Sequence, residues 1–184
     1  AVKAEHIKPA FKTIIDTATK ELQSLEAGVT PTWESAIVGM RDITAPLEHA
    51  WGVVSHLMAV RNSDALREAH AAVQGDVITF SLRISQSKPV YQAVKALSTG
   101  KHWATLDRAQ QRVVEATIKS AELSGIALEG DDLVAFNKHQ ATLATTSTQF
   151  SNNVLDATRA WFLDVTDPKD MEGMPSNARA AAAA

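Results

Sequence analysis

Residues 6–26, HIKPAFKTIIDTATKELQSLE, decide the fold of this chain. The apolar residues recur at intervals of three and four, which places their side chains on one face of an α-helix. They are Ile7, Phe11, Ile14, Ile15, Ala18, Leu22 and Leu25. Pro9 stands near the start, where its missing N–H costs little, and Gly28 with Thr30-Pro31 ends the segment. We therefore predict a helix over 6–26.

The same spacing continues in the two segments that follow. A stripe begins at Trp33 and contains Ile37, Met40, Ile43, Leu47, Trp51, Val54 and Met58. Pro46 lies inside it, and a proline removes one backbone donor and clashes one turn back, so we expect a kink or break near Thr44–Ala45. Asn62-Ser63-Asp64 is typical of a helix start. The stripe after it contains Leu66, Ala69, Val73, Val77, Phe80 and Ile84.

Turn and capping residues divide the rest of the chain into shorter helices. Ser87-Lys88-Pro89 opens a helix that Gly100 stops, and Asp107 with Gln110 fits the reciprocal capping pattern at a helix start. Gly125 is a plausible cap at the end of that helix. Gly130-Asp131-Asp132 then opens a longer helix that runs through Val154.

The pattern changes near the end of the chain. Trp161-Phe162-Leu163-Asp164-Val165 combines aromatic and β-branched residues, which favours a short strand or extended segment, although no partner strand is evident. A further helix begins near Ser176. We predict an all-α fold: one domain over 1–184, an antiparallel bundle or array of about six helices with a short extended segment near 161–165. A helical-repeat scaffold is an alternative, although no regular internal repeat is evident.

Composition excludes several classes of protein. The formal net charge is −3, from 18 basic and 21 acidic residues, without a basic stripe that could displace counterions from phosphates. We therefore expect no nucleic-acid partner. The absence of cysteine excludes disulfides, thiol catalysis and thiolate metal sites. No apolar stretch approaches the roughly 18–20 residues that span a bilayer, so we expect no membrane span.

The histidines do not have the spacing of a helical zinc site. Such a site needs two imidazoles one turn apart, with a glutamate beside the first. His49 and His56 are seven residues apart, roughly 10 Å along a helix, which is too far for one ion. Glu5-His6 and Glu48 beside His49 are neighbours in sequence and point in different directions. We predict no catalytic, no cofactor-binding and no metal-binding residues in this chain.

The four tryptophans are more often core or interface anchors than platforms for a ligand. Trp51 lies on an apolar stripe and is expected in the core. Trp103, in a linker between His102 and Ala104, is the best candidate for a contact surface. The residues alone do not disclose a function.

Several stretches, in order and at matching distances, resemble the amino-terminal region of the thimet oligopeptidase / oligopeptidase A family of zinc-dependent oligopeptidases. They are AEHIKPA (4–10), PTWE (31–34), AWGVVSHL (50–57), AVRNS (59–63), QFSNNVLDAT (149–158), VTD (165–167) and MEGMP (171–175). QSKPVY (86–91) leans towards the branch that contains plant organellar oligopeptidases. Two residues depart from the pattern. Pro46 lies in a helix that is usually polar and leucine-rich in the family, and Asn152 stands where the family usually has a glutamate. The resemblance covers nearly the whole chain.

The resemblance implies a mostly helical enzyme split by a deep channel, with zinc bound by a His-Glu-x-x-His helix in a carboxy-terminal half that this chain lacks. None of the family's catalytic residues maps onto a residue here, so zinc is expected only in that missing half. The segment in hand would form one wall of the channel and restrict entry to short peptides. The compartment implied is intracellular, either the cytoplasm or an organelle (chloroplast or mitochondrion).

Two hypotheses follow, from different classes of protein. In the first, the chain is a fragment of an intact zinc oligopeptidase, and its partner is the catalytic half of the same enzyme. In the second, it is a stand-alone helical scaffold or assembly subunit that binds another protein through a reused apolar surface. Both predict no peptidase activity from this chain alone.

Overall fold

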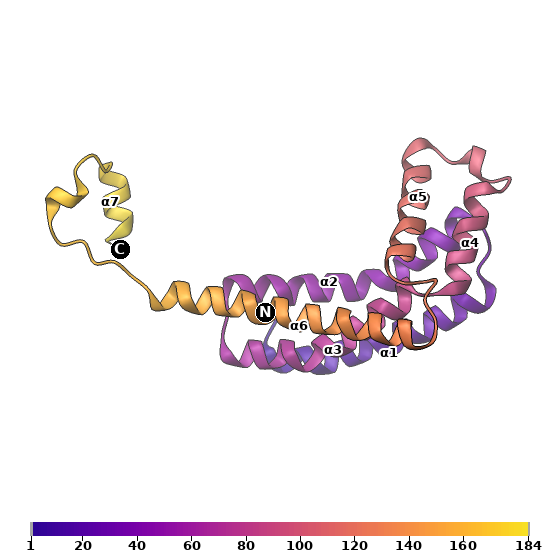
Figure 1. Cartoon of the computed structure of the whole chain (residues 1–184), viewed down its shortest axis with the longest axis horizontal. Helices are drawn as coiled ribbons and strands as arrows, with labels where there is room; N and C mark the ends of the chain where they lie inside the picture. The colour runs from indigo at the N-terminus through magenta and orange to yellow at the C-terminus, as the bar shows by residue number, and fades with distance from the viewer. Residues whose placement is uncertain (1, 184) are drawn as a thin grey trace. The chain divides into compact units, whose positions relative to one another are not determined.

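The computed structural model describes residues 2–183, with Pro168 described by its backbone alone. Among these residues it contains seven α-helices and no strand, so the prediction of an all-α fold is confirmed (Figure 1). The α-helices are α1 (Ala4–Gly28), α2 (Gly39–Val60), α3 (Asp64–Ser85), α4 (Lys88–Thr99), α5 (Arg108–Leu123), α6 (Gly130–Ala160) and α7 (Ser176–Ala182). Short helical turns lie between them: a π-helical turn η1 (Trp33–Val38) and the 3₁₀ turns η2 (Trp103–Thr105) and η3 (Pro168–Met171).

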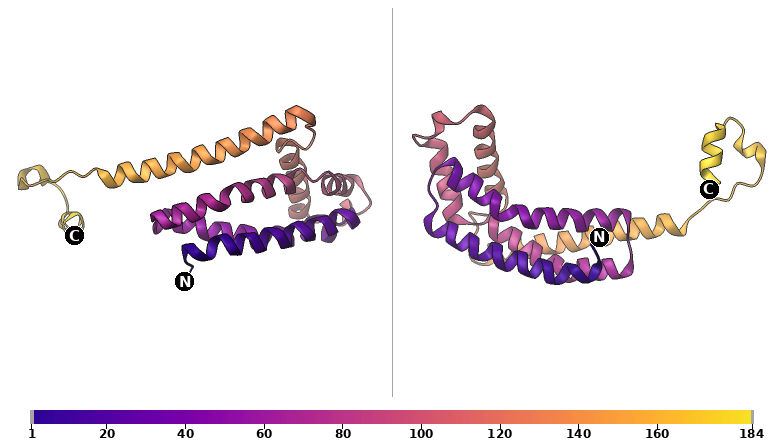
Figure 2. Two further views of the ribbon diagram at one scale, coloured as in Figure 1. Left: turned by 90° about the horizontal axis from the view of Figure 1, so that it is seen from below. Right: turned by 180° about the vertical axis from the view of Figure 1, so that it is seen from behind.

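Helices α1, α2 and α3 lie side by side, and the chain reverses direction at each connection between them (Figures 1 and 2). The apolar stripes predicted from the sequence meet here because each helix needs a partner for its apolar face. Ser63 caps α3 by accepting a hydrogen bond from the backbone N–H of Leu66 (3.3 Å). The buried residues of this first core cluster are Ile7, Phe11, Ala18, Leu22, Ile43, Leu47, Val54, Leu66, Val73, Val77 and Phe80.

We expected Pro46 to kink or break α2 near Thr44–Ala45. The helix is continuous from Gly39 to Val60, so the break is not there, and the kink stays a prediction. The proline leaves the carbonyl oxygen of Asp42 without its helical donor. Both residues are exposed, so water can hydrate that oxygen and the cost is small. The irregular turn lies earlier, in η1, where the Thr32 side chain accepts from the N–H of Ser35 (3.2 Å).

Helix α4 packs against α5 and against η1 around a second core cluster. The expected capping pair starts α5: the N–H of Gln110 donates to Asp107 Oδ1 (2.8 Å), and the N–H of Asp107 donates to Gln110 Oε1 (2.9 Å). The buried members of the cluster are Ala36, Val90, Ala93, Val94, Leu97 and Val114.

Two glycines end these helices for different reasons. A Cβ at Gly100 would lie 2.7 Å from the carbonyl oxygen of Ala96, so the close approach requires glycine. Gly125 has φ +82°, a left-handed conformation that side chains disfavour, and it follows Ser124, the C-cap residue of α5. Both helix ends are therefore where the sequence predicts them.

Polar side chains at α3 and its C-cap hold the first part of α6 in place. Gln86 Nε2 donates to the carbonyl oxygen of Ser124 (2.9 Å) and to Asn137 Oδ1 (2.8 Å). Further along, Gln74 Nε2 donates to the carbonyl oxygen of Ala144 (3.3 Å). No described residue of α6 is buried, so α6 is held by polar contacts and partial burial.

The chain divides into two compact units, residues up to Ala144 and residues from Thr145 onward. The second unit contains the end of α6, a non-helical stretch at 161–167, η3 and α7. The stretch predicted near 161–165 is therefore outside any helix, and the described residues provide no strand to pair with it. Helix α7 begins at Ser176, as the sequence predicts.

Candidate functional site

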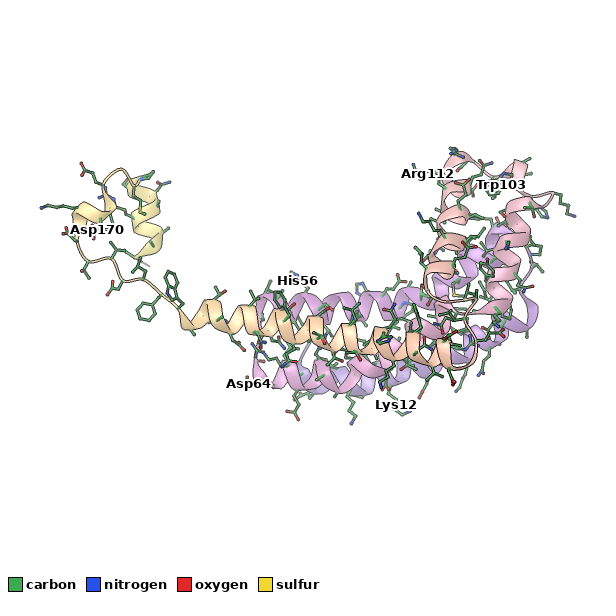
Figure 3. The ribbon with its side chains drawn as sticks, in the orientation of Figure 1. Lys12, His56, Asp64, Trp103, Arg112 and Asp170 are labelled. Atoms are coloured by element: carbon green, nitrogen blue, oxygen red, sulfur yellow. The ribbon has the colours of Figure 1, made fainter. Side chains whose placement is uncertain are left out.

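None of the described histidines belongs to a cluster of side chains that could bind a metal ion. His49 and His56 are both exposed on α2, where they line a shallow surface hollow with Glu48, and His56 points out from the helix (Figure 3). Within residues 2–183 no group of three His, Cys, Asp or Glu side chains could hold a metal ion. His6 Nε2 lies 3.9 Å from Glu5 Oε1 with both side chains more than half exposed, so solvent screens this pair.

A groove between α1 and α3 gathers charged side chains of both signs. Lys8, Lys12, Asp16, Asp76 and Arg83 line it, with apolar residues at its base. Lys12 Nζ lies 2.7 Å from Asp16 Oδ2, and the hydrogen bond to that carboxylate raises the pKa of Lys12. A lysine that acts as nucleophile or base needs a lowered pKa instead. The groove therefore contains a solvent-exposed i,i+4 ion pair between Lys12 and Asp16, and Lys12 is not a reactive lysine.

His70 is the histidine that sequence reasoning missed. It is buried on α3, its ring stacks on Trp51 with centroids 4.6 Å apart, and Trp51 meets Phe11 edge to face. Its Nδ1 has no hydrogen-bond partner among the described residues, and burial lowers the pKa of His70. The signal was available: position 70 falls on the stripe between Leu66 and Val73. Burial therefore disfavours the charged form of His70, whose ring packs on Trp51 beside the first core cluster.

The best-connected charged group is Glu26, near the end of α1. Arg83 on α3 reaches both of its carboxylate oxygens, at 2.7 Å from Nη1 to Oε1 and by a second hydrogen bond from Nη2 to Oε2. Ser87, buried at the start of α4, donates its hydroxyl to Glu26 Oε1 (2.5 Å). The hydrogen bond from Arg83 lowers the pKa of Glu26. These three residues join α1 to the connection between α3 and α4, and so fix the two core clusters to each other.

The structure places three of the tryptophans in different surroundings. Trp103, expected at a contact surface, is partly buried and packs against the second core cluster at the end of the α4–α5 pair (Figure 3). Its linker forms η2, and a short helical turn lets the indole fold back onto its neighbours. Trp51 packs on the first cluster, as expected of a core residue. Trp161 is instead 71 % exposed.

Trp161 belongs to a set of exposed apolar residues in the second unit. We call this set the exposed apolar segment: Phe150, Val154, Trp161, Phe162 and Leu163. Phe150 and Val154 are one turn apart on α6, so they share a face of that helix. Trp161, Phe162 and Leu163 follow one another directly after the helix ends. Exposed large apolar side chains such as these are candidates for an interaction surface.

Comparison with known proteins identifies the family of this chain. Residues 11–133 match the model described as "Neurolysin/Thimet oligopeptidase, N-terminal domain". The chain belongs to this family. It is 42 % identical to the "Probable cytosolic oligopeptidase A" of Arabidopsis thaliana over 97 % of this chain and 25 % of that protein. The "Organellar oligopeptidase A, chloroplastic/mitochondrial" of the same plant is 40 % identical over 97 % of this chain and 22 % of its own length. Oligopeptidase A of Escherichia coli (strain K12) is 34 % identical over 98 % of this chain and 27 % of its own length.

The chain thus spans about a quarter of the length of the curated oligopeptidases A that it matches. The resemblance read from the motifs is confirmed, including its plant branches. In the structure, the motif QFSNNVLDAT (149–158) forms the last turns of α6 and contributes Phe150 and Val154 to the exposed apolar segment.

Proposed function

We propose that this chain is the non-catalytic helical part of a zinc-dependent oligopeptidase and forms one wall of the channel through which short peptides reach the zinc. Family membership combined with coverage carries this proposal. The match extends over nearly all of this chain, but over only about a quarter of relatives whose names denote oligopeptidases. The remaining three quarters of such a protein have room for the catalytic site.

The residues of this chain do not fit zinc. His49 and His56 share a helix face but are separated by two turns, roughly 10 Å at 1.5 Å per residue, and the third ligand of a closed or catalytic site is missing around them. We therefore assign no step of hydrolysis to this chain. Zinc, held in the catalytic part, would supply the activated water that attacks the peptide bond.

The contribution of this chain would be exclusion and orientation. Helices α1 to α3 share one continuous core cluster, and the Glu26–Arg83–Ser87 network ties it to the second cluster. A wall built on two connected cores resists deformation, because packed interiors are dense and respond to strain as a unit. A rigid wall of this kind would exclude a folded protein from the channel by its size and leave room for an extended peptide.

The relatives also suggest a compartment. One is named a cytosolic protein and another a chloroplast and mitochondrial protein. Residues 2–183 include no helix that is long and apolar enough to cross a bilayer. We propose an intracellular location, in the cytoplasm or an organelle.

The exposed apolar segment supports one alternative from another class, a stand-alone scaffold or assembly subunit without peptidase activity. Such a protein would also need an uncovered apolar surface for its partner. The gene's reading frame separates the two: an oligopeptidase continues downstream to His-Glu-x-x-His, and a scaffold does not.

A peptidase assay tests the proposal directly. Residues 1–184 and the complete encoded polypeptide are incubated with a fluorogenic peptide and zinc, with and without a chelator. We expect turnover that the chelator abolishes from the complete polypeptide and none from residues 1–184. Chelator-sensitive turnover by residues 1–184 would show that this chain carries its own catalytic site. An inactive complete polypeptide would remove the oligopeptidase function.

A further inference from the structure

A cavity of about 220 Å³ lies beside the second core cluster, between α4 and α5. We call it the α4–α5 cavity. Its apolar lining comes from four helices: Met40 on α2, Ile84 on α3, Val90 and Val94 on α4, and Ile118 on α5. Both valines are buried, so the cavity reaches into the interior of the molecule.

Small side chains leave this space open. Thr117 and Ala121 line the cavity from α5, and Ser85 and Ser87 line it from the end of α3 and the start of α4. Side chains this short do not fill the space between α5 and Met40 on α2. Atoms that border an empty space lack partners on one side, and their dispersion energy is regained when an apolar group fills it. An occupant is therefore favoured.

The polarity of the lining selects the occupant. None of the described residues that line the cavity carries a charged side chain. Ser85 and Thr117 donate their hydroxyl protons to backbone carbonyl oxygens of their own helices (3.0 and 2.8 Å), and Ser87 and Tyr91 donate theirs to carboxylates of other helices (2.5 and 2.9 Å). The remaining hydroxyl belongs to Ser120, which is exposed to water. A carboxylate or carbonyl group buried in the cavity would therefore lose its hydrogen bonds to water without finding a free donor.

We propose that the α4–α5 cavity binds a small neutral apolar molecule, a hydrocarbon ring or branched chain of about seven to nine carbon atoms. An apolar cavity of about 150 Å³ already accommodates benzene, so 220 Å³ leaves room for a ring with a short side chain. A protein partner is the weaker occupant, because a stable protein interface buries about 800 Å² on each side and this cavity supplies little of that area. The site is separate from the channel wall proposed above and does not depend on it.

Binding at this site would join α5 to the first core cluster. Helix α5 packs on α4, whereas the cavity lies between α5 and residues of α2 and α3. An apolar occupant would contact Ile118 and Ala121 on α5 as well as Met40 and Ile84, which pack against the first cluster. It would therefore oppose the opening of α5, which is measured as slower hydrogen exchange of its amides.

Toluene is the probe for this site, and benzoate, which has the same ring with a negative charge, is its chemical control. Ala121→Leu places a larger side chain in the cavity, and Ala116→Leu makes the same change at an exposed residue of α5 outside it. Methyl chemical shifts of residues 1–184 are followed during each titration. Hydrogen exchange of α5 is measured in the complete encoded polypeptide with and without toluene.

We expect toluene to shift the methyl signals of Val94 and Ile118 with a Kd below ~1 mM, and to leave those of Val77 in the first core cluster in place. Benzoate should leave all three unchanged. Ala121→Leu should weaken toluene binding at least ~10-fold, because the added carbons take up the space of the ligand, and Ala116→Leu should not weaken it. Toluene at ten times its Kd should slow the exchange of the α5 amides about 10-fold.

Four results would each overturn the inference. Shifts that do not saturate, or that affect Val77 as much as Val94, would show that toluene dissolves in any apolar contact. Benzoate binding as tight as that of toluene, or equal losses in the two leucine variants, would remove the cavity as the site. Tighter binding of acetyl-phenylalanine amide than of toluene would make a peptide side chain the occupant. Unchanged exchange in the complete polypeptide would show that its own chain already fills the cavity.

Discussion

Replacing Glu26 by glutamine tests whether one carboxylate joins the two core clusters. Glu26 accepts hydrogen bonds from Arg83 and Ser87, and only 13 % of its side chain is exposed. Glu26→Gln keeps the shape and one acceptor oxygen, but it removes the negative charge and the second oxygen that Arg83 reaches. The variant therefore isolates the charge from the packing.

The expected loss follows from these contacts. A hydrogen bond to a charged group contributes about 1.5–3 kcal/mol. Arg83 is 47 % exposed, so water already screens part of the attraction and the lower part of that range applies. We expect Glu26→Gln to lower the free energy of unfolding at pH 7 by about 1–2 kcal/mol, a shift of about 4 °C in Tm for a chain of this size.

The pH dependence has a definite sign. The hydrogen bond from Arg83 lowers the pKa of Glu26 from its ordinary value of 4.5. A carboxyl whose pKa is lower in the folded chain stabilises the fold above its unfolded pKa, and the contribution is lost as the pH falls through the folded pKa. The wild type and Glu26→Gln should therefore differ at pH 7 and converge as the pH falls below about 4.

Urea unfolding at a series of pH values measures this difference. Glu129→Gln is the matched control, because Lys88 Nζ lies 2.6 Å from Glu129 Oε1 with both side chains mostly exposed. The urea midpoint of this control should not shift measurably. A difference between Glu26→Gln and wild type that stays constant down to pH 3 would refute the account, since the charge would then not be its cause.

Two further predictions concern the ends of α5 and the interior of α3. Gly125→Ala should lower the free energy of unfolding by about 1–2 kcal/mol because of the left-handed φ of +82°, whereas Gly28→Ala, with open space at its Cβ, should not; thermal unfolding decides. Burial lowers the pKa of His70, so the stability it permits is full above the unfolded value near 6.5 and falls as the pH drops through the folded pKa. His70→Phe keeps a ring against Trp51, and its urea midpoint should change less between pH 7 and 5 than that of the wild type. An unchanged pH dependence in this variant would show that His70 does not cause the loss of stability.

Local signals allowed much of the fold to be predicted. Asp107 and Gln110 are three residues apart, so their reciprocal hydrogen bonds can be inferred from adjacent sequence. Ser63 before α3 works in the same way. Gly125 was predictable because glycine is the residue that most readily adopts the left-handed conformation at a helix end. Helix positions follow from periodicity, and these caps then place the ends.

The features that sequence reasoning missed depend on distance along the chain or on solvent. Glu26 and Arg83 are 57 residues apart, and no local pattern connects them. Pro46 was expected to kink or break its helix, and the helix is not broken. Asp42 is exposed, so water can hydrate its freed carbonyl oxygen, and this exposure cannot be read from periodicity. Trp103 in a linker and Trp161 beyond a helix look alike in sequence, although one packs on a core cluster and the other is open to water.

The same ambiguity gives the exposed apolar segment its meaning. Periodicity identifies an apolar face but does not say which protein covers it. On α3 the stripe through Val73 and Val77 is covered by α1 within this chain. On α6, Phe150 and Val154 have the same helical spacing and no such cover. Large apolar side chains persist in water only at a cost, and this cost is why the exposed apolar segment is a candidate for contact with further polypeptide. A family in which this domain is a quarter of the protein is where such a surface is to be expected.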